Sequence, residues 1–224
     1  MVSLAHFLQL ILGTVIALLP IINPLASAPV YMAITEGDDE LWRRKQAFRG
    51  VCYMTGILVC FLIGGSVIMP FFGLSLPGLR IAGGLLISGI AFAMFAPPRE
   101  DHEELRRRAE ARAKRDVSFS PLAMPMLSGP GSIAVTIGFS SLATGWFDYV
   151  AIIMGILIVA AISYLVLRLS SRLVPMIGAN AMSGLTKIMA FLLLCIGIQF
   201  VVNGVVGVLT EPSLLATLKT ALHP

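Results

Sequence analysis

Six long, continuously apolar runs restrict what this 224-residue chain can fold into. They occupy residues 4–34, 47–70, 79–95, 119–143, 147–169 and 185–209. A helix of roughly 20 apolar residues crosses the hydrocarbon core of a bilayer, which is about 30 Å thick. The strands of a membrane barrel would alternate apolar and polar residues, and these runs do not. With 57% hydrophobic and only 12% charged residues, the sequence predicts an all-α polytopic membrane protein with six transmembrane helices.

The first run is too long for one straight crossing. At ~1.5 Å per residue it would reach ~46 Å as a helix, well beyond the core of the membrane. It is therefore expected to be broken, re-entrant or steeply tilted. A secretory signal is not favoured, because the first basic residue is Arg43 and the run exceeds the usual h-region. We interpret it as an uncleaved membrane segment.

The basic residues predict the orientation of the chain. Of the 16 Lys and Arg residues, all but Arg80 and Lys219 fall in or near the segments that join runs one to two, three to four and five to six. Because basic residues concentrate on the cytoplasmic side, both termini are expected on the periplasmic side of the bacterial inner membrane. This placement leaves no basic face for nucleic acid.

Two apolar runs carry a matching break. Asn23-Pro24 lies within LLPIINPLASAPV, and Gly129-Pro130 lies within PLAMPMLSGPGSIAV, 106 positions later. Residues 80–88 and 187–195 also align, at a shift of 107. Two features that agree within one residue favour a 3+3 inverted-topology repeat with broken helices 1 and 4. The predicted units are residues 1–97, a charged cytoplasmic loop at 98–118, and residues 119–224.

The breaks have a chemical use beyond bending a helix. Proline is well tolerated as the first residue of a helix, so a new half-helix is expected at Pro24 and another at Pro130. Asn23 is then an N-cap. The predicted substrate-binding residues at the two breaks are Asn23, Pro24, Ser27, Ser128, Gly129, Pro130 and Ser132. Helix N-termini present free N–H groups and partial positive charge, which suit an anion. The alternative is a pair of structural proline kinks, which are common in membrane helices.

The distribution of charged residues limits the chemical class of the ligand. All 12 acidic residues lie outside the six runs or at their edges, and Arg80 and Lys187 at run ends are expected to snorkel to the interface. With no fixed charge at mid-membrane, a zwitterion fits best: its carboxylate faces the helix N-termini and its ammonium faces exposed carbonyls. No cofactor is predicted. Coupling to Na⁺ through carbonyls stays open, as does uncoupled movement, whereas the lack of a buried carboxylate weakens coupling to H⁺.

Other residues in the runs are less specific. Ser88, Gln199 and Asn203 are possible pathway-lining residues, although polar groups of this kind also bond between helices. The glycines Gly83, Gly84 and Gly89 are expected to permit close helix packing. The cysteines Cys52, Cys60 and Cys195 are expected to be small buried apolar residues without metal-ligand spacing.

The segments INPLASAPV, LSLPGLRIAGGLLISGIAFAMF, PLAMPMLSGPGSIAV and KIMAFLLLCIGIQFVVNGV together resemble the MarC family of bacterial inner-membrane proteins. The resemblance covers essentially the whole chain. Related archaeal members are described as neutral amino acid transporters with two discontinuous helices that bear Asn-Pro and Gly-Pro type breaks. The resemblance thus implies a site at Asn23 and Pro24 with Gly129 and Pro130. The second break has Gly where the first has Asn, so the two half-sites need not bind equally.

The favoured hypothesis is a secondary transporter or exporter of small neutral amino acids. The alternatives are a membrane channel or a non-transporting scaffold and, ranked lower, a drug efflux protein. An enzyme is not expected, since His6, His102 and His223 lie near the chain ends or in a loop, without catalytic partners at membrane depth. The expected partners are a small neutral amino acid and the lipid bilayer. The oligomeric state is left open.

Overall fold

The computed structural model describes residues 4–95, 116–140, 143 and 145–211. Within these ranges every regular element is a helix and there is no strand. Five helices are long and apolar enough to cross a membrane, and a bent pair, Ser118–Leu127 with Pro130–Ser140, makes a sixth when counted as one span. The predicted all-α polytopic membrane fold is confirmed.

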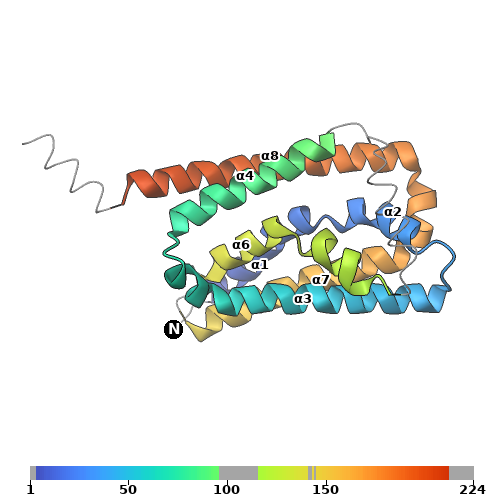
Figure 1. The fold of residues 1–224 in the computed structure, drawn as a ribbon, viewed down its shortest axis with the longest axis horizontal. Helices are drawn as coiled ribbons and strands as arrows, with labels where there is room; N and C mark the ends of the chain where they lie inside the picture. Colours follow the sequence, from blue (N-terminus) through green and yellow to red (C-terminus); the bar gives the residue numbers. More distant parts are fainter. Residues whose placement is uncertain (1–3, 96–115, 141–142, 144, 212–224) are drawn as a thin grey trace, which may run out of the picture.

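The helices form three layers (Figure 1). One outer layer holds α3 (Glu40–Phe71) and α7 (Trp146–Ile177), and the other holds α4 (Leu76–Phe95) and α8 (Ala179–Leu209). The middle layer holds the two broken segments: α1 (Leu4–Ile22) with α2 (Pro24–Ile34), and η1 (Ser118–Leu127) with α6 (Pro130–Ser140). The first break is buried inside the protein, where irregular backbone is sheltered from lipid, whereas the second break is partly exposed at Pro130.

Several helices extend beyond their apolar runs. Helix α3 begins at Glu40 rather than near residue 47, and α7 continues past Arg168 and Arg172 to Ile177. Charged residues with long side chains are good helix formers, so a helix need not end where the hydrocarbon ends. The turn into α8 comes at Gly178, whose φ of 77° favours glycine.

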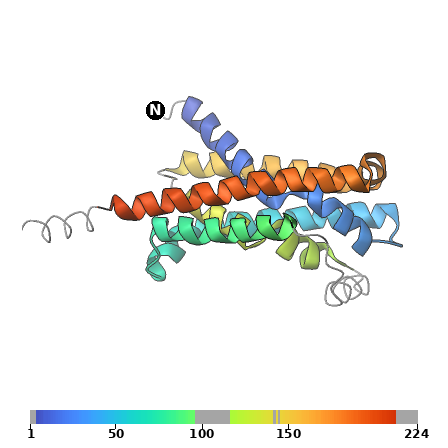
Figure 2. The same ribbon diagram turned by 90° about the horizontal axis from the view of Figure 1, so that it is seen from above.

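Helices α4 and α8 lie side by side along most of α4 (Figure 2). A Cβ atom on Gly84 would lie 2.5 Å from the Gly197 carbonyl oxygen, so only glycine allows this approach. A Cβ on Gly83 would be in tight contact with Ala134, at 3.2 Å. The predicted packing role is confirmed for these two glycines and is wrong for Gly89, which has open space around it.

The cysteines correct another expectation. Cys52, Cys60 and Cys195 are exposed on the surface of the chain and are not buried. Each lies in a part of its helix that is apolar on every side, so the sequence there does not distinguish the lipid-facing side from the protein-facing side.

One end of the molecule is held by polar contacts. Gln46 is buried on α3; it donates to Asp38 (Nε2 to Oδ2, 2.7 Å) and accepts the Val117 N–H at 2.8 Å. Arg49 pairs with Asp116 at 2.9 Å. Hydrogen bonding by Ser118 and the nearby Arg49 guanidinium lower the pKa of the Asp116 carboxyl. These contacts connect the start of α3 to the start of η1.

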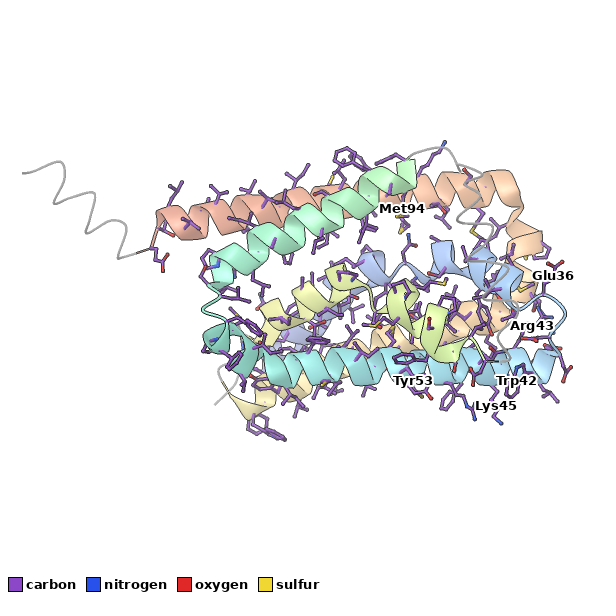
Figure 3. All side chains as sticks on the ribbon, in the orientation of Figure 1. Glu36, Trp42, Arg43, Lys45, Tyr53 and Met94 are labelled. Carbon is purple, nitrogen blue, oxygen red and sulfur yellow. The ribbon has the colours of Figure 1, made fainter. Side chains whose placement is uncertain are left out.

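The same end carries basic side chains outside the helix layers. Lys45 Nζ lies 5.4 Å and Arg49 Cζ 6.0 Å from the centre of the Trp42 ring. Figure 3 shows Trp42 and Lys45 pointing away from the bundle. Of the predicted loop at 98–118, residues 98–115 lie outside the described residues, as does the stretch 212–224 of the second predicted unit.

The two halves contain similar elements in the same order. Each begins with a broken segment that ends in an 11-residue helix, and each continues with a 32-residue helix. The division of the chain into these units and the inverted relation between the halves stay predictions.

Candidate functional site

The first break is built around Asn23, as predicted. Asn23 lies between α1 and α2 with a left-handed φ of 43°, a conformation that asparagine tolerates better than most residues. Its Oδ1 accepts the Ala26 N–H at 3.3 Å, so it caps α2, and Pro24 is the first residue of that helix. Pro24 has no N–H, which leaves the Pro20 carbonyl without its usual intrahelical donor.

One donor at this break is unused. Asn23 is 6% exposed, and its Nδ2 is buried without a hydrogen-bond partner in the described part of the chain. Such a group costs about 1–3 kcal/mol when left unpaired. The N-terminus of α2 thus carries an amide that is free to donate, together with the partial positive charge of the helix end.

The second break has the predicted shape and a different chemistry. Helix α6 begins at Pro130 and bends by 66° from η1. In η1, Ser120 and Met124 have non-helical backbone angles because each precedes a proline, Pro121 and Pro125.

The serines of the second break are satisfied internally. Ser128 Oγ donates to the Ala123 carbonyl at 2.6 Å, and Ser132 Oγ donates to the Gly129 carbonyl at 2.9 Å. Both serines are buried, whereas Pro130 is exposed. The N–H groups of Gly131 and Ser132 precede the first intrahelical bonds of α6 and supply its positive end. The second break therefore offers only backbone N–H donors, whereas the first break also offers the side-chain amide of Asn23.

The structure brings the two breaks together. An added Cβ on Gly131 would lie 3.4 Å from Ile21 Cγ2 and 3.3 Å from Ile87 Cγ1. Gly131 follows Pro130 and Ile21 precedes Asn23 by two residues, so the start of α6 packs against the end of α1. Ile22 and Leu127, which flank the breaks, belong to one buried apolar cluster.

The first break lies near the middle of α7. Helices α1 and α7 run side by side from one end of the molecule: His6 Nε2 is 3.3 Å from Asp148 Oδ1, and a Cβ on Gly155 would meet Thr14. Tyr31 lies beside Leu167 at the other end. Because α1, α2 and α7 rise by the same distance per residue, Asn23 lies between the Thr14–Gly155 and Tyr31–Leu167 pairs, beside the middle of α7.

Ser163 occupies this level and was missed by sequence reasoning. Its side chain is fully buried, and its Oγ has no hydrogen-bond partner among the described residues. Thr14 on α1 lies beside Gly155 on α7. Counting eight residues onward from this contact leads to Ile22 on α1, next to the break, and to Ser163 on α7, so Ser163 lies at the level of the break. Two unpaired polar groups, Asn23 Nδ2 and Ser163 Oγ, therefore lie at the same depth. The signal in the sequence was an isolated serine inside the fifth apolar run.

The other polar residues have separate positions. Ser88 lies on α4 against Gly197 of α8, at the packed interface of that pair. Gln199 Nε2 donates to Asn203 Oδ1 at 2.9 Å on the exposed side of α8. Asn203 lines a pocket between α4, α6 and α8 that also contains Arg80. None of the three is placed at the breaks by a described contact.

The family comparison agrees with this architecture. Residues 8–209 match the model of the MarC family, described as integral membrane proteins. The chain belongs to the MarC family. The inner membrane protein MarC of Citrobacter koseri and that of Salmonella typhimurium are each 33% identical over 209 residues, covering 88% of this chain and 94% of the relative. That of Escherichia coli O139:H28 is 32% identical over the same shares.

The resemblance seen in the sequence motifs is therefore confirmed, and this MarC-family protein is an integral inner-membrane protein. No solved structure matches it.

Proposed function

We propose that this MarC-family protein is a secondary transporter or exporter of small neutral amino acids, held where the two broken helices meet. The observation that carries the proposal is the buried, unpaired Nδ2 of Asn23 beside the start of α2. A carboxylate placed there accepts this N–H and faces the positive ends of α2 and α6. Binding then satisfies a donor that the empty protein leaves unpaired.

The ammonium group of the same solute has acceptors nearby. Pro24 and Pro130 cannot donate a backbone hydrogen bond, so the Pro20 and Met126 carbonyls lack the donor four residues later. Carbonyls freed in this way suit an ammonium group or Na⁺, as in other transporters built from discontinuous helices. Ser163 Oγ supplies a further polar contact at this depth. The protein needs no cofactor and performs no chemical reaction in this proposal.

We also propose that both termini face the periplasm. The basic end with Arg43, Arg44 and Lys45 then lies in the cytoplasm.

Uptake measurements on two Asn23 variants test the proposed site. Asn23→Asp keeps the cap acceptor and the size of the side chain but replaces the N–H₂ donor with a charged oxygen. Asn23→Gly keeps the left-handed backbone, costs a few tenths of a kcal/mol as a cap, and removes the donor without adding charge. A hydrogen bond to a charged group contributes about 1.5–3 kcal/mol, so Asn23→Gly should lower kcat/KM about 10- to 100-fold.

In the assay, radiolabelled neutral amino acids are added outside the proteoliposomes, with and without a Na⁺ or pH gradient, and the label that enters the vesicles is counted. Asn23→Asp should be impaired more than Asn23→Gly, because it repels the carboxylate, while both variants keep the melting temperature of a folded protein. Wild-type uptake by both variants would refute the site. Ion currents, or no saturable flux of any amino acid in the wild type, would favour a channel or a scaffold instead.

A further inference from the structure

A second pocket lies away from the breaks, between α4, α6 and α8. Its volume is about 220 Å³, and its lining residues are Arg80, Val135, Gly138, Phe139, Phe200 and Asn203. The α6 residues among them follow Pro130 by more than one helical turn, toward the end of that helix. The pocket therefore opens near the side of the membrane where α4 begins and α8 ends, and the N-terminus of α6 is no part of it.

The lining combines one cation with apolar walls. Arg80 is half-buried and makes no ion pair with any residue that the structure describes. The Asn203 side chain adds an amide, held by Gln199 through its oxygen, so that its NH₂ group is the part left to donate. Val135, Phe139 and Phe200 provide apolar surface. None of the described residues that line the pocket is acidic, so they offer an ammonium group no counter-charge.

The volume sets the size of the occupant. A cavity of ~150 Å³ holds a benzene molecule, and a water molecule takes up ~30 Å³ of liquid. A volume of 220 Å³ therefore exceeds the need of one or two waters and matches a small organic molecule. A guanidinium recognises the planar carboxylate group of such a molecule through a forked pair of hydrogen bonds.

We propose that this pocket is a binding site for small organic carboxylates with a short apolar body, with Arg80 as the cation and Asn203 as a second donor. The site is distinct from the breaks and does not depend on transport there. It selects for a carboxylate on an aliphatic or aromatic body and does not require an amino group. The sequence alone suggested that Arg80 snorkels to the interface; the pocket gives its charge a specific use.

Binding of isocaproate and of its uncharged amide tests the proposal. The purified full chain, in nanodiscs of phosphatidylcholine only, is titrated with each compound by calorimetry. The two probes have nearly the same shape, so their difference reports the carboxylate. Isocaproate should bind at least 10-fold more tightly than isocaproamide, and Arg80→Gln should remove this advantage while Arg80→Lys keeps part of it.

Three further variants test whether isocaproate binds in this pocket and not elsewhere on the protein. Lys187→Gln removes the matching cation of α8, which does not line the pocket, and should bind isocaproate like the wild type. Asn23→Asp should also bind it normally, which separates this pocket from the breaks. Gly138→Leu places a side chain where an added Cβ meets open space, and should block binding without disturbing the fold.

Three results would overturn the proposal. The first is equal affinity of the wild type for the acid and the amide, and the second is equal affinity of Arg80→Gln and the wild type for the acid. The third is an absence of isocaproate binding; if retention of phosphatidylglycerol then depends on Arg80, the pocket is assigned to an anionic lipid headgroup.

Discussion

Four side chains carry a buried polar atom without a hydrogen-bond partner among the described residues. Two of these atoms, Arg43 Nε and Arg44 Nε, belong to arginines at the basic end of the molecule, and the other two lie within the helix layers. Asn23 Nδ2 lies at the start of α2, and Ser163 Oγ lies at the same depth on α7. Several other buried hydroxyls bond within their own helix; for example, Thr14 Oγ1 donates to the Leu10 carbonyl at 2.8 Å. Unpaired groups are costly, and we therefore connect Asn23 and Ser163 to the binding of a solute.

Replacing Ser163 with alanine separates binding from stability. The hydroxyl has no partner to lose, so Ser163→Ala should leave the melting temperature unchanged or raise it by a few degrees. If the hydroxyl contacts the solute, the apparent KM for amino acid uptake should rise about 3- to 10-fold. Both quantities can be measured on the same proteoliposome preparation.

Thr14→Val is the matched control for this change. It removes a buried hydroxyl on the neighbouring helix that is already bonded, so it should lower stability by about 1 kcal/mol and leave KM unchanged. A fall in stability for Ser163→Ala, with an unchanged KM, would mean that Ser163 only packs the α1–α7 interface.

The sequence predicted the starts of the two half-helices better than the bounds of the long helices. The half-helix starts at Pro24 and Pro130 and the cap at Asn23 are local effects of proline and asparagine, so the sequence predicted them correctly. The apolar runs do not give the bounds of α3, α7 and α8, because hydrophobicity reports the part of a helix inside the membrane and these helices continue outside it. Ser163 and Arg80 could not be assigned, because their roles depend on which distant helix faces them.

The glycines of α4 provide a test of the α4–α8 contact. A methyl group on Gly84 would lie 2.5 Å from the Gly197 carbonyl oxygen and 2.8 Å from the Val201 nitrogen, which are backbone atoms that cannot move alone. Gly84→Ala should therefore destabilise the protein by about 1–3 kcal/mol through overpacking. Thermal unfolding in detergent, followed by light scattering or circular dichroism, measures the effect.

Gly89→Ala on the same helix is the control. Nothing lies within 4 Å of an added Cβ at Gly89, and alanine is the better helix former. This variant should be as stable as the wild type or slightly more stable. Equal stability of the two variants would show that α4 and α8 do not pack as closely as described.

The molecule as a whole has two different ends. One carries four basic residues on the first three turns of α3: Arg43, Arg44, Lys45 and Arg49. The other carries exposed aromatic side chains, Phe71 and Phe72 at the end of α3 and Trp146 and Phe147 at the start of α7. The basic end is expected in the cytoplasm.

Labelling of single cysteines tests this orientation. With the three native cysteines replaced, Leu74→Cys, in the turn before α4, should react with a membrane-impermeant maleimide in cells whose outer membrane has been opened. Asp39→Cys, at the start of α3, should react only after the inner membrane is permeabilised as well. The opposite pattern would place the termini in the cytoplasm.

The length of α3 and α7 has a consequence for the surrounding lipid. Each has 32 residues, or ~48 Å of helix, against a hydrocarbon core of ~30 Å. To fit a helix of this length inside the hydrocarbon core, tilt alone would have to reach ~50°, whereas the tilt of membrane helices is rarely more than ~40°. Both helices therefore extend past the acyl chains. A change of bilayer thickness by a few ångströms moves the lipid boundary along continuous helix. The broken segments packed against α3 and α7 keep their position within the protein.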